Sequence, residues 1–145
     1  MDKNGYLIDL SESPRTDFGK RAFSEQSYPQ KVFSAIWELE SDVNNGGFTQ
    51  YFTNCWPEPS VAFSPEALRA IGAQKCAKIV EKALALLPPD LPQDADDRSE
   101  FFDSKESLVE SLSALDGDFF AYPDNLTDLL FEFVSSHPKD FGPIS

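Results

Sequence analysis

Residues 28–54 read YPQKVFSAIWELESDVNNGGFTQYFTN, and this stretch decides the fold class. Over residues 29–45 the apolar side chains recur every three or four positions, which predicts an amphipathic helix. Two asparagines and two glycines end this segment, and both residue types tolerate the left-handed backbone that closes helices. The aromatic residues of 48–52 then suit a short second helix. We therefore expect a tight reversal between two packed helices at the glycines.

Caps, prolines and helical spacing continue through the rest of the chain. Strand-like alternation is limited to Tyr6–Ile8. We predict a single all-α domain over residues 1–145 with six or seven helices, and we expect residues 1–12 to be loosely ordered. The first further segment is a helix from Ser13–Pro14 that stops before Ser27. One helix, or two consecutive helices separated at Gly72, should run from Ser64–Pro65 to the prolines at 88–92. After a loop or short acidic helix over 94–102, we expect a helix capped by Asp103–Glu106 that ends near Asp116–Gly117, and a last helix over about 124–136.

Composition limits the class of protein. The 145 residues are 41% hydrophobic and 13% aromatic, which is enough apolar material for the core of one domain. The formal net charge is -13 and the sequence pI is about 4.3. Direct binding to nucleic acid or to an anionic membrane is therefore not expected, because those partners attract basic surfaces. If the charge is functional, the partner is basic.

The sequence also indicates a cellular compartment. Residues 1–5 lack the basic and apolar regions of a signal peptide, and the longest apolar run, residues 83–87, is too short to cross a bilayer. We expect a cytoplasmic protein. Cys55 and Cys76 have no CxxC spacing, so we interpret them as reduced thiols, with a disulfide between them as the alternative.

Acidic residues are concentrated late in the chain. Residues 90–145 contain 14 acids and three bases, whereas residues 1–89 contain 11 acids and nine bases. In the last expected helix Asp124, Asp128 and Glu132 fall at i, i+4 and i+8. Like charges at this spacing cost an isolated helix about 0.2–0.5 kcal/mol per pair. A chain selected only to fold would usually place lysines between them.

The preceding segment repeats this pattern. A helix there would align four carboxylates in one stripe, those of Asp96, Glu100, Asp103 and Glu110. Glu106 and Glu110 would form a further i, i+4 pair of like charges. Four helical residues advance about 6 Å, close to the interval between DNA phosphates along one strand. These carboxylates could therefore imitate a row of phosphates. The alternative is a solvated face that keeps the protein soluble, and Asp124 could instead favour a helix N-terminus.

The motif from Trp37 to Asn54 resembles the signature of a bacterial family of unknown biochemical function that is named after a DNA-mimic member. In that signature a WELE-type helix runs into VNNGGF, then QYF and Asn. The likeness continues in ALRAIGA at 67–73 and in matches from 115 to 138. The resemblance implies an all-helical fold that is often a homodimer. For the namesake branch it also implies an acidic surface that occupies the DNA-binding face of a transcription factor.

The polar residues around the two glycines have two interpretations. They are Glu38, Glu40, Asn44, Asn45, Gly46, Gly47, Gln50 and Tyr51. In the structural interpretation, both asparagines bond free carbonyls or amides at the helix ends. Both glutamates, Gln50 and Asn54 then complete a polar network, and Trp37, Phe48 and Phe52 lie in the core. The alternative is a small-molecule or peptide pocket built from Glu40, both asparagines, Gln50 and Tyr51.

Enzymatic chemistry has little support in the sequence. His137 precedes Pro138 at a helix end, where we expect it to cap the helix or lie exposed. One histidine and two distant cysteines do not form a metal cluster, and the segment Asp94–Asp97 lacks the glycine and distal glutamate of a calcium loop. No phosphate-binding or nucleophile motif occurs. We therefore expect no catalytic residues, no metal and no cofactor.

These observations favour an acidic protein-binding module. The leading hypothesis is a DNA mimic that occupies the DNA-binding surface of a transcription factor or other basic protein and competes with DNA. The alternative is an immunity-type protein that neutralises another cationic protein, such as a toxin. A small-ligand binder or enzyme that uses the NNGG turn is less expected.

Overall fold

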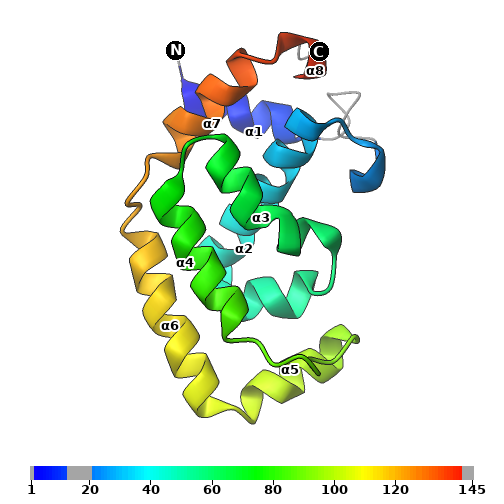
Figure 1. Ribbon diagram of the computed structural model, residues 1–145, viewed down its shortest axis with the longest axis vertical. Coiled ribbons are helices and arrows are strands. Elements are labelled where there is room, and N and C mark those ends of the chain that lie inside the picture. Colours follow the sequence, from blue (N-terminus) through cyan, green and yellow to red (C-terminus); the bar gives the residue numbers. More distant parts are fainter. Residues whose placement is uncertain (1, 13–20, 142–145) are drawn as a thin grey trace.

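The computed structural model describes residues 2–12 and 21–141. Within these residues the chain forms eight α-helices, one short 3-10 helix and no strand, which confirms the all-α prediction (Figure 1). In chain order the elements are α1 (Lys3–Ser11), η3 (Phe23–Glu25), α2 (Tyr28–Cys55), α3 (Pro59–Ala70), α4 (Gln74–Ala85), α5 (Ala95–Asp103), α6 (Glu106–Phe120), α7 (Leu126–Ser135) and α8 (Pro138–Phe141). Most of the helix expected from Ser13 lies outside the described residues.

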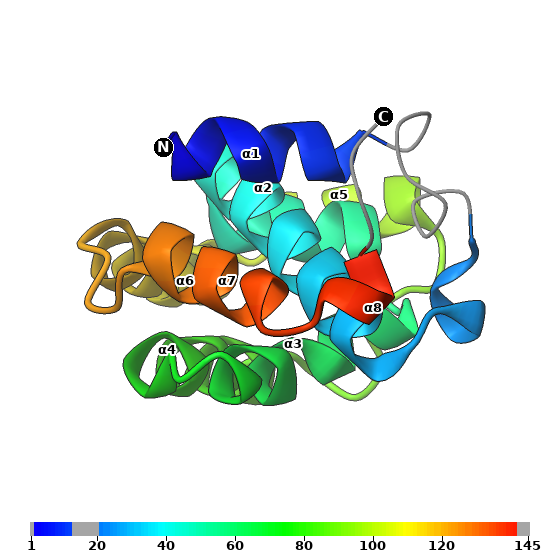
Figure 2. The same cartoon turned by 90° about the horizontal axis from the view of Figure 1, so that it is seen from above.

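Helix α2 is the centre of the fold. It contacts α3, α5, α6, α7 and α8, while α1 packs on α7 and α4 packs on both α3 and α6. Figure 2 shows α1 on one side of α2 and α7, and the α3–α4 pair on the other side. Helices α1 and α7 lie at one end of the molecule and α5 lies at the opposite end (Figure 1). Within the described part of the chain, no helix is both long and apolar enough to cross a membrane.

The two halves of α2 supply much of the core. Phe48 and Phe52 are buried as predicted, and Phe33 is buried too. Trp37, also expected in the core, is only partly buried and is stacked on Phe33 with ring centroids 5.5 Å apart. Full burial of an apolar side chain of this size contributes about 1.5–3 kcal/mol. A capping box between Ser27 and Gln30 begins the helix.

The two glycines produce a bend rather than the predicted reversal. Gly46 and Gly47 have non-helical dihedral angles, and Gly47 has φ of 76°. The helix resumes at once, and its second half turns aside from the first (Figure 1). The residues at which the first helical segment ends were therefore predicted correctly. The predicted direction of the chain after the glycines was wrong. Packing against α3 and α6 sets that direction, which the local sequence does not encode.

Two elements in the first half of the chain were not expected in this form. Tyr6–Ile8, the one place with strand-like alternation in the sequence, lies in α1, with Asp2 as the N-cap and Leu7 and Leu10 buried. Helix α3 begins at Pro59, so Pro65 lies inside it. Proline leaves one carbonyl of the previous turn without its donor. The Ser64 hydroxyl donates 2.8 Å to the Val61 carbonyl and supplies the missing bond.

Other helix boundaries lie closer to the glycines and prolines that predicted them. Gly72, at φ of 89°, separates α3 from α4, which is the two-helix alternative, and α5 is the acidic helix expected after the prolines. Helix α6 has Lys105 as its N-cap without a side-chain bond, so the predicted capping arrangement is absent. The helix also continues past Gly117, because one exposed glycine costs only about 0.5–1 kcal/mol.

Candidate functional site

The eight acidic residues predicted to bind a partner fall into two groups. Five lie on α5 and α6, are all exposed, and form what we name the acidic edge: Asp96, Glu100, Asp103, Glu106 and Glu110. The other three, Asp124, Asp128 and Glu132, lie just before or on α7. Because α5 and α7 lie at opposite ends of the molecule, the eight do not form one continuous ridge (Figure 1).

The acidic edge owes its orientation to the burial pattern of α5. Arg98 and Phe102 are one turn apart and both are buried, which turns the carboxylates of that helix toward solvent. The carboxylates of Asp103, Glu106 and Glu110 line a single shallow depression of about 400 Å³ where α5 meets α6. Part of the edge is therefore brought together in space.

No basic side chain of residues 2–12 and 21–141 forms an ion pair with the acidic edge. Arg98 is the nearest arginine in sequence, but it is only 3% exposed and its guanidinium points inward. It donates to the carbonyls of Phe52 and Thr53, at the end of α2, and to those of Pro92 and Gln93. The Lys105 ammonium lies 5.6 Å from the centroid of the Phe101 ring. The negative charge of the edge is thus left without a bonded counter-charge.

The residues around α7 are different, because two of the three have intramolecular partners. Asp124 accepts a 2.9 Å hydrogen bond from the backbone N–H of Cys76, near the start of α4. Asp128 forms a 3.1 Å ion pair with Lys3. Only Glu132 is exposed without such a bond. Lys3 lies 125 residues from Asp128 in sequence, so sequence spacing could not reveal the pair.

A polar cluster joins the two halves of α2, and its centre is Asp42, a residue absent from the predicted site. Asp42 Oδ1 accepts from Gln50 Nε2 at 3.1 Å and from Asn54 Nδ2 at 3.2 Å. Its Oδ2 accepts from the Cys55 thiol at 3.0 Å. Asp42 lies eight residues before Gln50, and residues at this spacing lie on the same side of a helix. This spacing could have placed Asp42 in the predicted site. These bonds fix the bend at the glycines from its concave side.

The two predicted glutamates of the motif point to different elements. Glu38 accepts a 2.7 Å hydrogen bond from Ser60 of α3. Glu40 accepts a 3.0 Å bond from the hydroxyl of Tyr122, beyond α6. Burial raises the pKa of both carboxyl groups, and the hydroxyl bonds oppose part of that rise. The motif therefore ties α2 to two separate neighbours.

The asparagines were assigned the wrong partners. Asn44 donates to the Tyr122 hydroxyl at 2.8 Å and Asn45 donates to Gln50 Oε1 at 3.3 Å, so the bonds run to side chains and not to helix-end backbone groups. Tyr122 has a positive φ of 47°, which is uncommon outside glycine. Its bonds to α2 hold it in this conformation.

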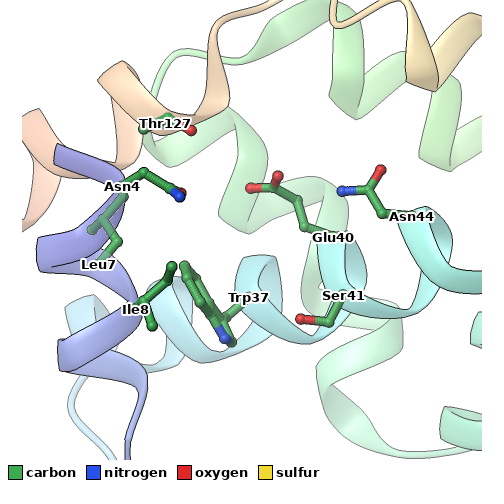
Figure 3. A pocket seen from close by; sticks show the side chains of 8 residues that line it. All are labelled: Asn4, Leu7, Ile8, Trp37, Glu40, Ser41, Asn44 and Thr127. Carbon is green, nitrogen blue, oxygen red and sulfur yellow. The ribbon is translucent and has the colours of Figure 1, made fainter. Parts of the chain in front are cut away.

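A cavity of about 240 Å³ lies between α1, α2 and α7 (Figure 3). Glu40 and Asn44 are the members of the predicted pocket that line it. Asn45, Gln50 and Tyr51 do not, and Tyr51 is fully buried in the core. The other lining residues are Asn4, Leu7, Ile8, Trp37, Ser41 and Thr127.

The cysteines and the single histidine are the remaining potentially reactive side chains. Both cysteines are free and buried; burial raises the pKa of Cys76 to about 11 and also raises that of Cys55. His137 Nδ1 lies 2.7 Å from the Phe133 carbonyl, so the ring caps the end of α7. Among the described residues, no group of three or more His, Cys, Asp or Glu side chains could hold a metal.

Comparison with known proteins identifies the family of the chain. No curated protein and no solved structure matches the chain. The model of a family described as DMP19-like protein matches residues 24–137, which include the bend in α2, the acidic edge and α7. The chain belongs to the DMP19-like protein family.

Proposed function

We propose that this protein is an acidic protein-binding module that acts as a DNA mimic through the acidic edge of α5 and α6. The observation that carries the proposal is the set of exposed carboxylates on these helices with no ion pair to the described basic residues. Membership of the DMP19-like family is compatible with this role.

The physical argument concerns both charge and spacing. Carboxylates one helical turn apart repeat at about 6 Å, close to the separation of phosphates along a DNA strand. Arg98 stabilises the interior and does not neutralise the surface. A basic groove-reading surface could therefore pair with this edge in place of DNA.

The partner in this proposal is a DNA-binding protein, such as a transcription factor, in the cytoplasm. It can hold either this protein or its DNA site, so inhibition is competitive. The acidic edge takes part in no catalytic step in this proposal. Self-association as a homodimer would present two such edges and would increase avidity.

The test is capture of partners from native cytosol, followed by DNA competition with the recovered basic protein. We expect binding to weaken steeply between about 50 mM and about 500 mM salt, because exposed charges are screened. The triple variant D103N/E106Q/E110Q should lose capture. The matched control E25Q/E58Q/E66Q removes the same charge from exposed positions outside the edge and should retain it.

Each outcome decides between alternatives. Equal loss in both triple variants would show that net charge, and not the edge, attracts the partner. Loss only in D128N/E132Q would move the binding surface to α7. A recovered basic protein that never binds DNA would replace mimicry with neutralisation of a toxin-like protein.

A further inference from the structure

We propose that the cavity between α1, α2 and α7 is a binding site for a primary alkylammonium group, with Glu40 as its counter-ion and Trp37 as part of its apolar wall. The site is separate from the acidic edge and does not depend on the proposed DNA mimicry. The argument rests on the lining of the cavity, its size and the bonding of the Glu40 carboxylate.

Glu40 supplies the only charged side chain among the eight that line the cavity. Its carboxylate extends into the space and faces Asn4 and Thr127 on the opposite wall (Figure 3). No basic side chain of the described residues pairs with it. A partly buried carboxylate without a counter-charge is costly, and a bound cation would offset that cost.

The nearest lysine in the neighbouring helix cannot serve as that cation in the observed arrangement. Lys3 precedes the cavity-lining Asn4, but its ammonium pairs with Asp128 at 3.1 Å and lies 5.6 Å from the centroid of the Phe131 ring. The Lys3 ammonium is therefore already engaged by two residues of α7. None of the described basic residues therefore supplies a counter-charge for Glu40.

The bonding of Glu40 favours an ammonium over a guanidinium. One lone pair of Oε2 is already used by the Tyr122 hydroxyl, so a bidentate guanidinium would have to share that oxygen, whereas an ammonium can pair with the other oxygen alone. An ammonium needs single acceptors in three directions. Besides the second oxygen of Glu40, the side chains of Asn4 and Thr127 line the same cavity and each carries an oxygen that can accept a hydrogen bond.

The size and the apolar lining define the rest of the ligand. The cavity volume of about 240 Å³ is below the roughly 300–1,000 Å³ of most pockets for drug-sized ligands. It suits a small amine or one lysine side chain. Leu7, Ile8 and Trp37 would contact the aliphatic part, and an indole within about 6 Å of a cation adds a cation–π attraction.

Nuclear magnetic resonance titration tests the site with four probes of similar size: butylammonium, butylguanidinium, butanol and butyrate. We expect saturable shifts of the Trp37 indole N–H and of the Asn4 and Asn44 side-chain amides with butylammonium. Butylguanidinium should bind more weakly, and butanol at least about tenfold more weakly. Butyrate should not bind. A fifth probe, N-acetyl-lysine methylamide, tests whether the natural ligand is a lysine side chain of a protein or a free amine. Tighter binding than that of butylammonium would indicate a protein side chain, and weaker binding would indicate a free amine.

Two variants of one helix provide the control. E40Q keeps an acceptor for Tyr122 but removes the charge, and should weaken butylammonium binding about tenfold. E38Q makes the same change two residues earlier, on the side of α2 that faces Ser60, and should bind as the wild type does. Equal weakening by both variants, equal binding of butanol and butylammonium, or no saturable shift with butylammonium in the wild type would each overturn the proposal.

Discussion

The carboxylate of Asp116 accepts a 2.8 Å hydrogen bond from the backbone N–H of Phe48, 68 residues earlier in the chain. Phe48 is the first residue after the two non-helical glycines, so its N–H begins the second half of α2. Asp116 therefore acts as an N-cap supplied by another helix, and its negative charge faces a helix N-terminus. This bond fixes the bend of α2 against α6.

Replacement of Asp116 by alanine should destabilise the fold by about 1–3 kcal/mol, because it leaves the buried Phe48 N–H without an acceptor. Chemical denaturation measures this change. The matched control is D118A, two residues later on the exposed side of α6, which should change stability by less than about 0.5 kcal/mol. If D116A were as stable as D118A, the bond would not hold the bend.

Gly47 should not accept a side chain. Its φ of 76° is strained for any other residue, and an added Cβ would clash with Asp116 Oδ2. We expect G47A to cost at least about 1–3 kcal/mol. G117A is the control, since a Cβ there meets nothing within 4 Å and alanine favours α6 by about 0.5–1 kcal/mol.

The steric and backbone components of the Gly47 effect can be separated. In a D116A background the close contact disappears while the positive φ remains. The cost of G47A should therefore be smaller there than in the wild type, with a coupling energy of about 0.5 kcal/mol or more. Additive effects would mean that only the backbone angle matters.

The sequence predicted the fold class because the helical spacing and the caps are local features. The glycines marked the bend, and Gly72 marked the division between α3 and α4. The continuation of α6 past Gly117 needs only the small cost of one exposed glycine, whereas the direction of the bend and the start of α3 at Pro59 depend on contacts between helices. Contacts between helices cannot be predicted from the spacing of residues along the chain.

The candidate site was predicted in part for the same reason. The stripe on α5 and α6 follows from helical periodicity, and all five of its carboxylates are exposed. The other features depend on bonds between residues 45 or more positions apart. These are the bonds from Arg98 to the end of α2, the Lys3–Asp128 pair and the bonds between Tyr122 and α2. Only the folded arrangement could separate the acidic edge from α7.

Arg98 should be essential for stability and not for partner binding. R98M should lower the free energy of unfolding by at least about 2 kcal/mol, because the carbonyls of Phe52 and Thr53 lose their buried donor. R98K keeps the charge but not the fork of donors, so it should recover only part of the loss. Thermal denaturation ranks the three proteins, and equal stability of R98M and wild type would contradict this role.

Stability should rise as the pH is lowered from neutrality toward the ordinary pKa values of carboxyl groups. Burial raises the pKa of Glu38, Glu40 and Asp116 above the ordinary values of about 3.9–4.3. The folded state therefore binds more protons than the unfolded state in this window. The stabilising contribution is fully present below the unfolded pKa and is lost as the pH rises through the raised folded pKa.

The double variant E38Q/E40Q separates this linkage from general charge repulsion. It should flatten the dependence of the free energy of unfolding on pH, because two of the three shifted groups no longer titrate. The control E25Q/E132Q removes the same charge from exposed positions and should keep the wild-type slope. A wild-type stability that increases with pH in this window would mean that ion-paired carboxylates dominate. Identical slopes in both double variants would assign the effect to the net charge of the chain.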